Sequence, residues 1–162
     1  MSIKIVAIGN KLMGDDGAAI HIIEWLGRSF EEGGIEVIIG ETDFEYCLSK
    51  IEEDDYIIII DATWFGIEPG TVTVNSLKNI YRLNGNQSLF SQHGYSFIKA
   101  LGSNYKAIDG IIVGIEGKSF DFTLSLSSSI EASFDNICSK VQETIWKRVN
   151  NLNNNTISYN VN

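Results

Sequence analysis

Proline, cysteine and histidine are scarce in this chain, which has one, two and two of them among 162 residues. Cys47 and Cys138 lie far apart and match no metal-binding or redox spacing. Both fall in apolar helical patterns, so we expect buried thiols in a reducing cytoplasm. The single proline, Pro69, precedes Gly70 at a point where the chain needs a turn.

Basic residues are also few, since 12 lysines and arginines stand against 21 acidic residues for a net charge of −9. An acidic surface repels nucleic-acid phosphates and anionic lipid, so neither is an expected partner. No run approaches the roughly 20 apolar residues that cross a bilayer, and we expect no membrane insertion. The first residues lack the apolar stretch and cleavage site of a signal peptide, which predicts a cytoplasmic protein.

The composition that remains is that of an ordinary globular protein, with 44% hydrophobic and 20% charged residues. The length suits one domain, which we expect over residues 1–149. Residues 150–162 are rich in asparagine and poor in core-forming side chains, so we expect a frayed C-terminal tail there.

The hydrophobic pattern predicts alternating strands and helices. Continuous apolar runs predict buried strands at 3–8, 35–39, 56–60 and 111–115. One alternating segment predicts an edge or antiparallel strand at 71–74. Apolar residues at helical spacing predict helices at 19–26, 45–51, 93–101 and 129–149. This order indicates an α/β three-layer sandwich, in which helices flank both faces of a mostly parallel, twisted sheet of about five strands, one of them antiparallel.

Ligands in such folds bind beyond the carboxyl ends of the strands, where Asp15 and Asp16 follow the first strand. One aspartate there would cap the next helix. A second, adjacent aspartate adds charge repulsion without adding a cap, so Asp16 is a candidate for a further role. A dinucleotide site is the weaker interpretation, because the turn lacks GxGxxG and two acids would repel a pyrophosphate.

Asp61 is the second candidate. It ends the bulky apolar run at 56–60, at the carboxyl end of a predicted strand. Burying a carboxylate there without partners would be costly. Asp61 therefore either accepts hydrogen bonds from backbone N–H groups of the following turn or belongs to a site at the sheet edge.

His93 is the third candidate, at the start of a predicted helix. The helix dipole disfavours the imidazolium there and favours the neutral, metal-binding imidazole. A capping or solvent-exposed histidine is the alternative interpretation. The other histidine, His21, lies beside Glu24 and Arg28 on the first helix, and we expect it at the surface.

Two carboxylates and an imidazole from separate loops suit Zn²⁺, Ni²⁺, Fe²⁺ or Mn²⁺. The spacing of Asp16, Asp61 and His93 carries no compact signature such as HExxH. The residues alone therefore indicate only a candidate metal site at the strand ends.

Five segments carry a more specific pattern: Ile8-Gly9-Asn10 with Leu12 and Asp15-Asp16-Gly17, then Tyr56 to Ala62, Glu68 to Val72, Ser91-Gln92-His93, and Val113 to Glu116. In this order the segments resemble the hydrogenase maturation endopeptidases. The resemblance covers about residues 3–149. Each segment is weak alone, and the specificity lies in the set.

The resemblance implies an activity. Enzymes of this family remove a short C-terminal extension from the large-subunit precursor of a NiFe hydrogenase after nickel has entered it. By matching position, the resemblance implies that Asp16, Asp61 and His93 bind this Ni²⁺, which the precursor carries, and act as the catalytic residues of an aspartic-type or metal-dependent endopeptidase. It also implies that Zn²⁺ or Cd²⁺ can occupy the same site.

Three places depart from the family pattern, and one is the stretch Gly117 to Asp121, which lacks the family's frequent proline. Ala19 stands where the family often has glycine, and Glu41 adds an acid where a glycine-rich run is common. These departures leave the three candidate ligands intact but leave the cognate hydrogenase open. Two other functions stay open as well: a non-proteolytic chaperone that binds nickel or the precursor, and a small α/β enzyme or nucleotide-binding module unrelated to metals.

Overall fold

The computed structural model describes residues 1–82, 92–105 and 108–159, without the side chains of residues 82, 92, 93 and 155–159. Its strands are β1 (Ile3–Ile8), β2 (Glu36–Glu41), β3 (Tyr56–Thr63), β4 (Val72–Ser76) and β5 (Asp109–Glu116). Its helices are the short 3₁₀ helix η1 (Gly14–Gly17), α1 (Ala18–Glu32), α2 (Phe44–Ser49), α3 (Leu77–Arg82), α4 (Gln92–Asn104) and α5 (Ser128–Tyr159).

The described strands form a five-stranded sheet in the order β2-β1-β3-β5-β4. β1 pairs with β2 and β3 in parallel, and β3 pairs with β5 in parallel. β4 runs antiparallel to β5 at one edge. The predicted fold is therefore confirmed, including the antiparallel strand that the alternation of residues 71–74 indicated.

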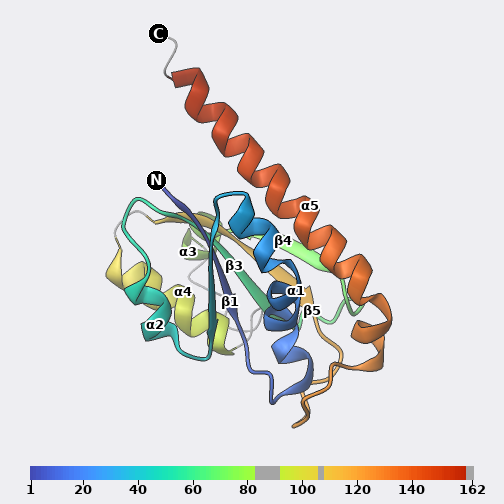
Figure 1. Cartoon of the computed structure of the whole chain (residues 1–162). Helices are drawn as coiled ribbons and strands as arrows, with labels where there is room; N and C mark the ends of the chain where they lie inside the picture. Colours follow the sequence, from blue (N-terminus) through green and yellow to red (C-terminus); the bar gives the residue numbers. More distant parts are fainter. Residues whose placement is uncertain (83–91, 106–107, 160–162) are drawn as a thin grey trace.

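Both faces of the sheet are covered by helices, and β3 shows how its sequence produces this. Because successive side chains of a strand point to opposite faces, Tyr56, Ile58 and Ile60 pack in one apolar cluster with α1 and α5. Ile57 and Ile59 pack in a second cluster with α2, α3 and α4. Figure 1 shows α1 and α5 on one side of the sheet and α2 and α4 on the other.

Some boundaries differ from the predictions. β3 continues through Asp61 to Thr63, and the short helix α3 was not predicted. α5 was predicted to end at Val149, where the apolar periodicity stops, but it continues to Tyr159. Leu152 still packs against the first cluster, and an established helix extends at little cost. The C-terminal part of α5 projects away from the body of the protein (Figure 1). Residues 160–162 of the predicted tail and the predicted loop at 84–91 lie outside the described residues.

Cys47 and Cys138 are free and buried, with 1% and 3% of their surface exposed, as predicted. Cys47 belongs to the second cluster and Cys138 to the first. In the part of the chain that the structure describes, no helix combines the length and apolar character needed to cross a membrane.

Candidate active site

The turn after β1 brings η1 close to the sheet. Gly9 has φ +141°, and a Cβ placed on it would lie 2.0 Å from the carbonyl oxygen of Asp16. Only glycine permits this approach. The Gly9 N–H donates to the carbonyl of Glu41 at 3.0 Å, so the turn is also tied to the end of β2. The Glu41 side chain is exposed.

Asp16 lies in η1 and is 7% exposed. Its Oδ2 accepts a hydrogen bond from the backbone N–H of Asn10 at 2.8 Å. Its own N–H donates to the carbonyl of Met13 at 3.2 Å. The turn that follows β1 therefore fixes both the backbone and the carboxylate of this candidate ligand.

Asp15 does not cap α1, and the capping interpretation of this residue is wrong. The cap position of α1 is Gly17, and no side chain caps it. The Asp15 carboxylate, which is fully buried, reaches instead into the loop between β5 and α5. Its Oδ2 accepts from the N–H groups of Lys118 at 2.7 Å and Ser119 at 3.0 Å, and its Oδ1 accepts from that of Ser127 at 2.7 Å.

Asp61 is fully buried near the carboxyl end of β3, opposite Gly114 of β5. By the alternation of the strand its side chain belongs to the face of Ile57 and Ile59, which α4 covers. η1, which carries Asp16, packs against β3. The fold thus brings the segments of two predicted ligands together at one edge of the sheet.

His93 is the second residue of α4, but its side chain lies outside the described residues. Among the side chains that are described, no three of His, Cys, Asp and Glu form a group that could hold a metal ion. This set excludes His93. The meeting of Asp16, Asp61 and His93 at one ion therefore stays a prediction.

His21 is half-buried, whereas we expected it at the surface. Lys11 extends to Glu24, with Nζ 2.7 Å from Oε1. The His21 Nδ1 atom is 3.7 Å from the same carboxylate. Burial lowers the pKa of His21, and the nearby Lys11 ammonium lowers it further.

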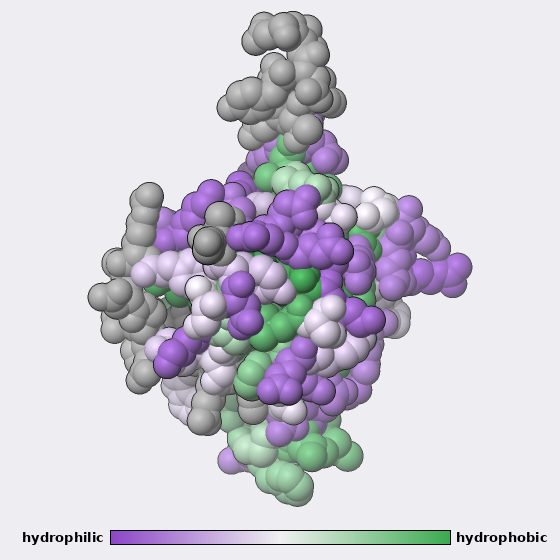
Figure 2. Space-filling view, turned by 90° about the vertical axis from the view of Figure 1, so that its left-hand side faces the viewer, coloured by the Kyte–Doolittle hydropathy of each residue, from purple (hydrophilic) through white to green (hydrophobic). Residues whose placement is uncertain are grey.

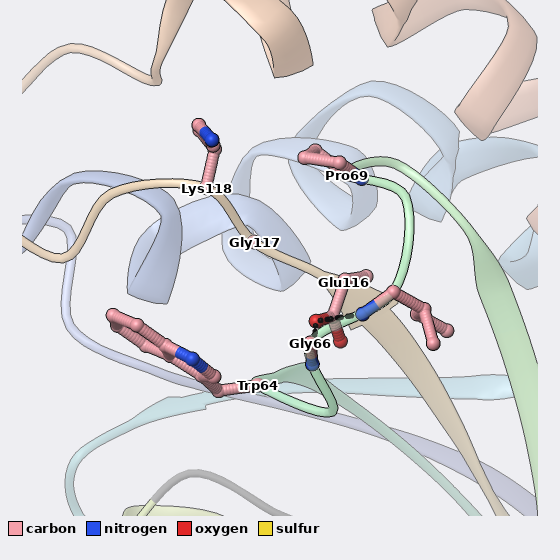
Figure 3. Close-up of a pocket in the computed structure, with 7 residues that line it drawn as sticks. Trp64, Gly66, Pro69, Glu116, Gly117 and Lys118 are labelled. Carbon is pink, nitrogen blue, oxygen red and sulfur yellow. Dashed lines mark hydrogen bonds between the residues drawn. The ribbon is translucent and has the colours of Figure 1, made fainter.

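Glu116, the last residue of β5, organises the opposite side of the site and was not predicted to do so. Its carboxylate is 1% exposed and accepts from the Thr63 hydroxyl at 2.9 Å. It also accepts from three backbone N–H groups of the following turn, those of Phe65 at 2.9 Å, Gly66 at 2.8 Å and Ile67 at 3.2 Å. Figure 3 shows this carboxylate pointing into the turn. The available signal was an acid that ends an apolar strand, which is the signal that identified Asp61.

A cavity of about 210 Å³ lies beside this turn, lined in part by Trp64, Ile67, Pro69 and Lys118 (Figure 3). The Trp64 ring stacks on Phe120, with 4.9 Å between ring centroids. This contact joins the turn after β3 to the loop after β5.

A family model described as hydrogenase maturation protease matches residues 20–144. The chain belongs to this family. The matched range includes Asp61 and His93 and begins after Asp16. The assignment of Asp16 therefore depends on the resemblance of the opening motif and on its place in the fold.

Individual relatives agree with the membership of this family. The chain is 32% identical to a putative hydrogenase maturation protease of Methanocaldococcus jannaschii, over 82% of its own length and 89% of the relative's. It is 25% identical to the hydrogenase expression/formation protein HoxM of Azotobacter vinelandii, over 83% and 67% of the two chains.

Solved protease structures share the fold. The NiFe hydrogenase maturation protease HybD of Thermococcus kodakarensis superposes with a TM-score of 0.66 at 27% identity, covering 89% of this chain and 99% of that one. The hydrogenase maturating endopeptidase HybD of Escherichia coli gives a TM-score of 0.72 at 22% identity, covering 91% and 94%. The second likeness concerns the fold alone.

Proposed function

We propose that this protein is the endopeptidase that removes the C-terminal extension from a nickel-loaded NiFe hydrogenase large-subunit precursor. The observation that carries the proposal is the pair of carboxylates at the carboxyl edge of the sheet, in a chain of the hydrogenase maturation protease family. Asp16 and Asp61 are 7% and 0% exposed, on two segments that pack together. Carboxylate oxygens at such a place are suitable ligands of a divalent cation.

The proposed ligands are Asp16, Asp61 and His93, and the ion is the Ni²⁺ that the precursor carries. Two carboxylates and an imidazole are suitable donors for a borderline divalent ion and leave coordination positions open for the precursor's own groups. Zn²⁺ or Cd²⁺ fits the same donor set.

The nickel requirement acts as a specificity device. A precursor without nickel lacks the contact that the three side chains make, so it binds too weakly to be cut. The fold holds one of the three in place in advance, because the Asn10 N–H fixes the Asp16 carboxylate. Such preorganisation aligns the precursor's scissile bond relative to the site.

The test is incubation of the purified protein with nickel-loaded precursor under anaerobic conditions, followed by mass spectrometry of the released C-terminal peptide. We expect release with nickel-loaded precursor and none with nickel-free precursor. Asp16→Asn, Asp61→Asn and His93→Ala should each slow release by about 100-fold or more, since even changes around a metal ligand cost about 10- to 100-fold.

The matched control is Asp54→Asn, which removes an exposed carboxylate that accepts a hydrogen bond from the N-terminal amine. It should cleave at the parent rate. Binding of the precursor without any release of peptide would identify a non-proteolytic chaperone. Equal release from nickel-free precursor would contradict the proposed role of the ion.

A further inference from the structure

We propose that Asp15 is a positioning residue: its buried carboxylate holds the 117–127 loop in the place where the loop's apolar side chains contact the substrate polypeptide. The inference rests on the proposed function and names a second part of the same site. Asp15 is the residue next to the predicted ligand Asp16. Because Asp15 caps no helix, its burial needs an explanation of its own.

Asp15 holds both ends of the loop at one carboxylate. The N–H groups of Lys118 and Ser119 reach Oδ2, and the N–H of Ser127 reaches Oδ1. The backbone N–H of Asp15 also donates to the carbonyl of Ser119 at 2.9 Å. An ionised acceptor makes hydrogen bonds about twice as strong as a neutral one. Asp15 therefore closes the loop as a short cross-link would.

The middle of the loop bonds the same turn. Gly14 donates to the carbonyl of Thr123 at 2.9 Å, and Thr123 donates to the carbonyl of Leu12 at 3.0 Å. These bonds therefore fix the position of the loop against the segment 10–17, which contains Asp16. A displacement of the loop would change the surface directly beside the candidate ligand.

The loop is not held by burial of its apolar tip. Phe122 is 80% exposed and Leu124 is 69% exposed, and Leu12 beside them is 49% exposed. Figure 2 shows hydrophobic surface at the lower end of the molecule, where the 117–127 loop lies in Figure 1. Exposed apolar surface of this kind is typical of a binding site.

The position of this surface indicates its occupant. It adjoins the turn of Asp16 on one side, and the stack of Trp64 on Phe120 links it to the end of β3, which carries Asp61, on the other. A polypeptide that reaches Asp16 and Asp61 along this border would contact this surface. The occupant is therefore an apolar segment of the substrate that is being cut.

The test compares Asp15→Asn with the parent protein and with Asp55→Asn. Asp55 is also a buried aspartate, 4% exposed, and accepts hydrogen bonds from Glu52 and Lys4 at the opposite edge of the sheet. Both variants should lose stability, but they should differ in the loop. In Asp15→Asn, hydrogen exchange of the amides of residues 118, 119 and 127 should accelerate by about tenfold or more.

With nickel-loaded precursor, Asp15→Asn should raise KM about tenfold while kcat changes by less than about twofold. Its affinity for added Zn²⁺ should equal that of the parent. Asp55→Asn should match the parent in all three measurements. An unchanged KM or unchanged exchange in Asp15→Asn would overturn the inference, and so would an equal rise of KM in Asp55→Asn.

A second variant covers the case in which Asp15→Asn does not fold. Phe122→Ala combined with Leu124→Ala removes only exposed side chains and should raise KM about tenfold with an unchanged unfolding midpoint. An unchanged KM would overturn the inference while leaving the proposed function intact. If the parent releases no peptide, the proposed function itself fails.

Discussion

Glu116 and Thr63 face each other across β5 and β3, and the Thr63 hydroxyl donates to the Glu116 carboxylate at 2.9 Å. The same carboxylate accepts from the N–H groups of the next turn. The Glu116 side chain at the end of β5 thus fixes the turn that follows the neighbouring strand β3, just after Asp61. Asp15 does the same for the loop after β5, so two buried carboxylates organise both borders of the candidate site.

Replacement of Glu116 should therefore loosen the turn after β3. Glu116→Ala leaves the Thr63 hydroxyl and three backbone N–H groups without their acceptor, and we expect the free energy of unfolding to fall by about 2–3 kcal/mol. Glu116→Gln keeps the shape and part of the bonding, so its loss should be about 1 kcal/mol. Urea unfolding measures both. Glu68→Ala, which removes an exposed acid of the same connection, should stay within about 0.5 kcal/mol of the parent.

Substitution of Gly9 should displace η1. The Cβ that Gly9→Ala introduces would lie 2.0 Å from the carbonyl oxygen of Asp16, so this variant should lower the free energy of unfolding by about 3 kcal/mol or more. It should also weaken binding of added Zn²⁺, because Asp16 moves with η1.

Gly34 offers the matched control for this variant. It has φ +82°, and nothing lies within 4 Å of a Cβ placed on it. Gly34→Ala should therefore cost only the conformational strain, about 1 kcal/mol, and leave Zn²⁺ binding unchanged. Thermal unfolding and titration calorimetry measure the two effects. Equal losses in both variants would show that the contact with Asp16 is unimportant.

The two thiols should make stability depend on pH in the alkaline range. Burial raises the pKa of Cys47 from 9.0 to about 11, with a smaller effect of Asp43, and burial raises that of Cys138 from 9.0 to about 11. Thiols of the unfolded chain lose their protons first, so the stability present below pH 9 should be lost as the pH rises to about 11.

Urea midpoints across this range test the dependence on pH. The double variant Cys47→Ala, Cys138→Ala should show a shallower decline than the parent. Burial also raises the pKa of Tyr81, from 10.0 to about 12, so part of the decline should persist in the double variant at higher pH. Alkylation by iodoacetamide at about pH 8 should be slow in the native protein and fast in urea, because only the thiolate reacts. If the urea midpoint of the double variant declined with pH as steeply as that of the parent, the assignment of this decline to the thiols would be contradicted.

Much of the fold could be predicted from local patterns. The run Tyr56 to Ile60 is apolar at every position, and such a run indicates a strand covered on both faces, as β3 is. Helical spacing predicted α1 and the packed part of α5, and the apolar neighbours of Cys47 and Cys138 predicted their burial. Each of these signals is carried by residues close together in sequence, because the side-chain periods of strands and helices are local properties of the backbone.

The roles of the acids could not be predicted in this way. Asp15, Asp61 and Glu116 all occur at or just beyond the carboxyl end of a strand, yet the bonds of Asp15 reach 103 to 112 residues along the chain and those of Glu116 reach 49 to 53. A carboxylate needs donors that have no other acceptor, and tertiary structure alone decides which loop supplies them. The sequence by itself determined the strands, the helices and the buried faces. The folding of distant loops onto Asp15 and Glu116 decided that these two acids serve the architecture. Asp16, Asp61 and His93 stay the predicted ligands of the ion.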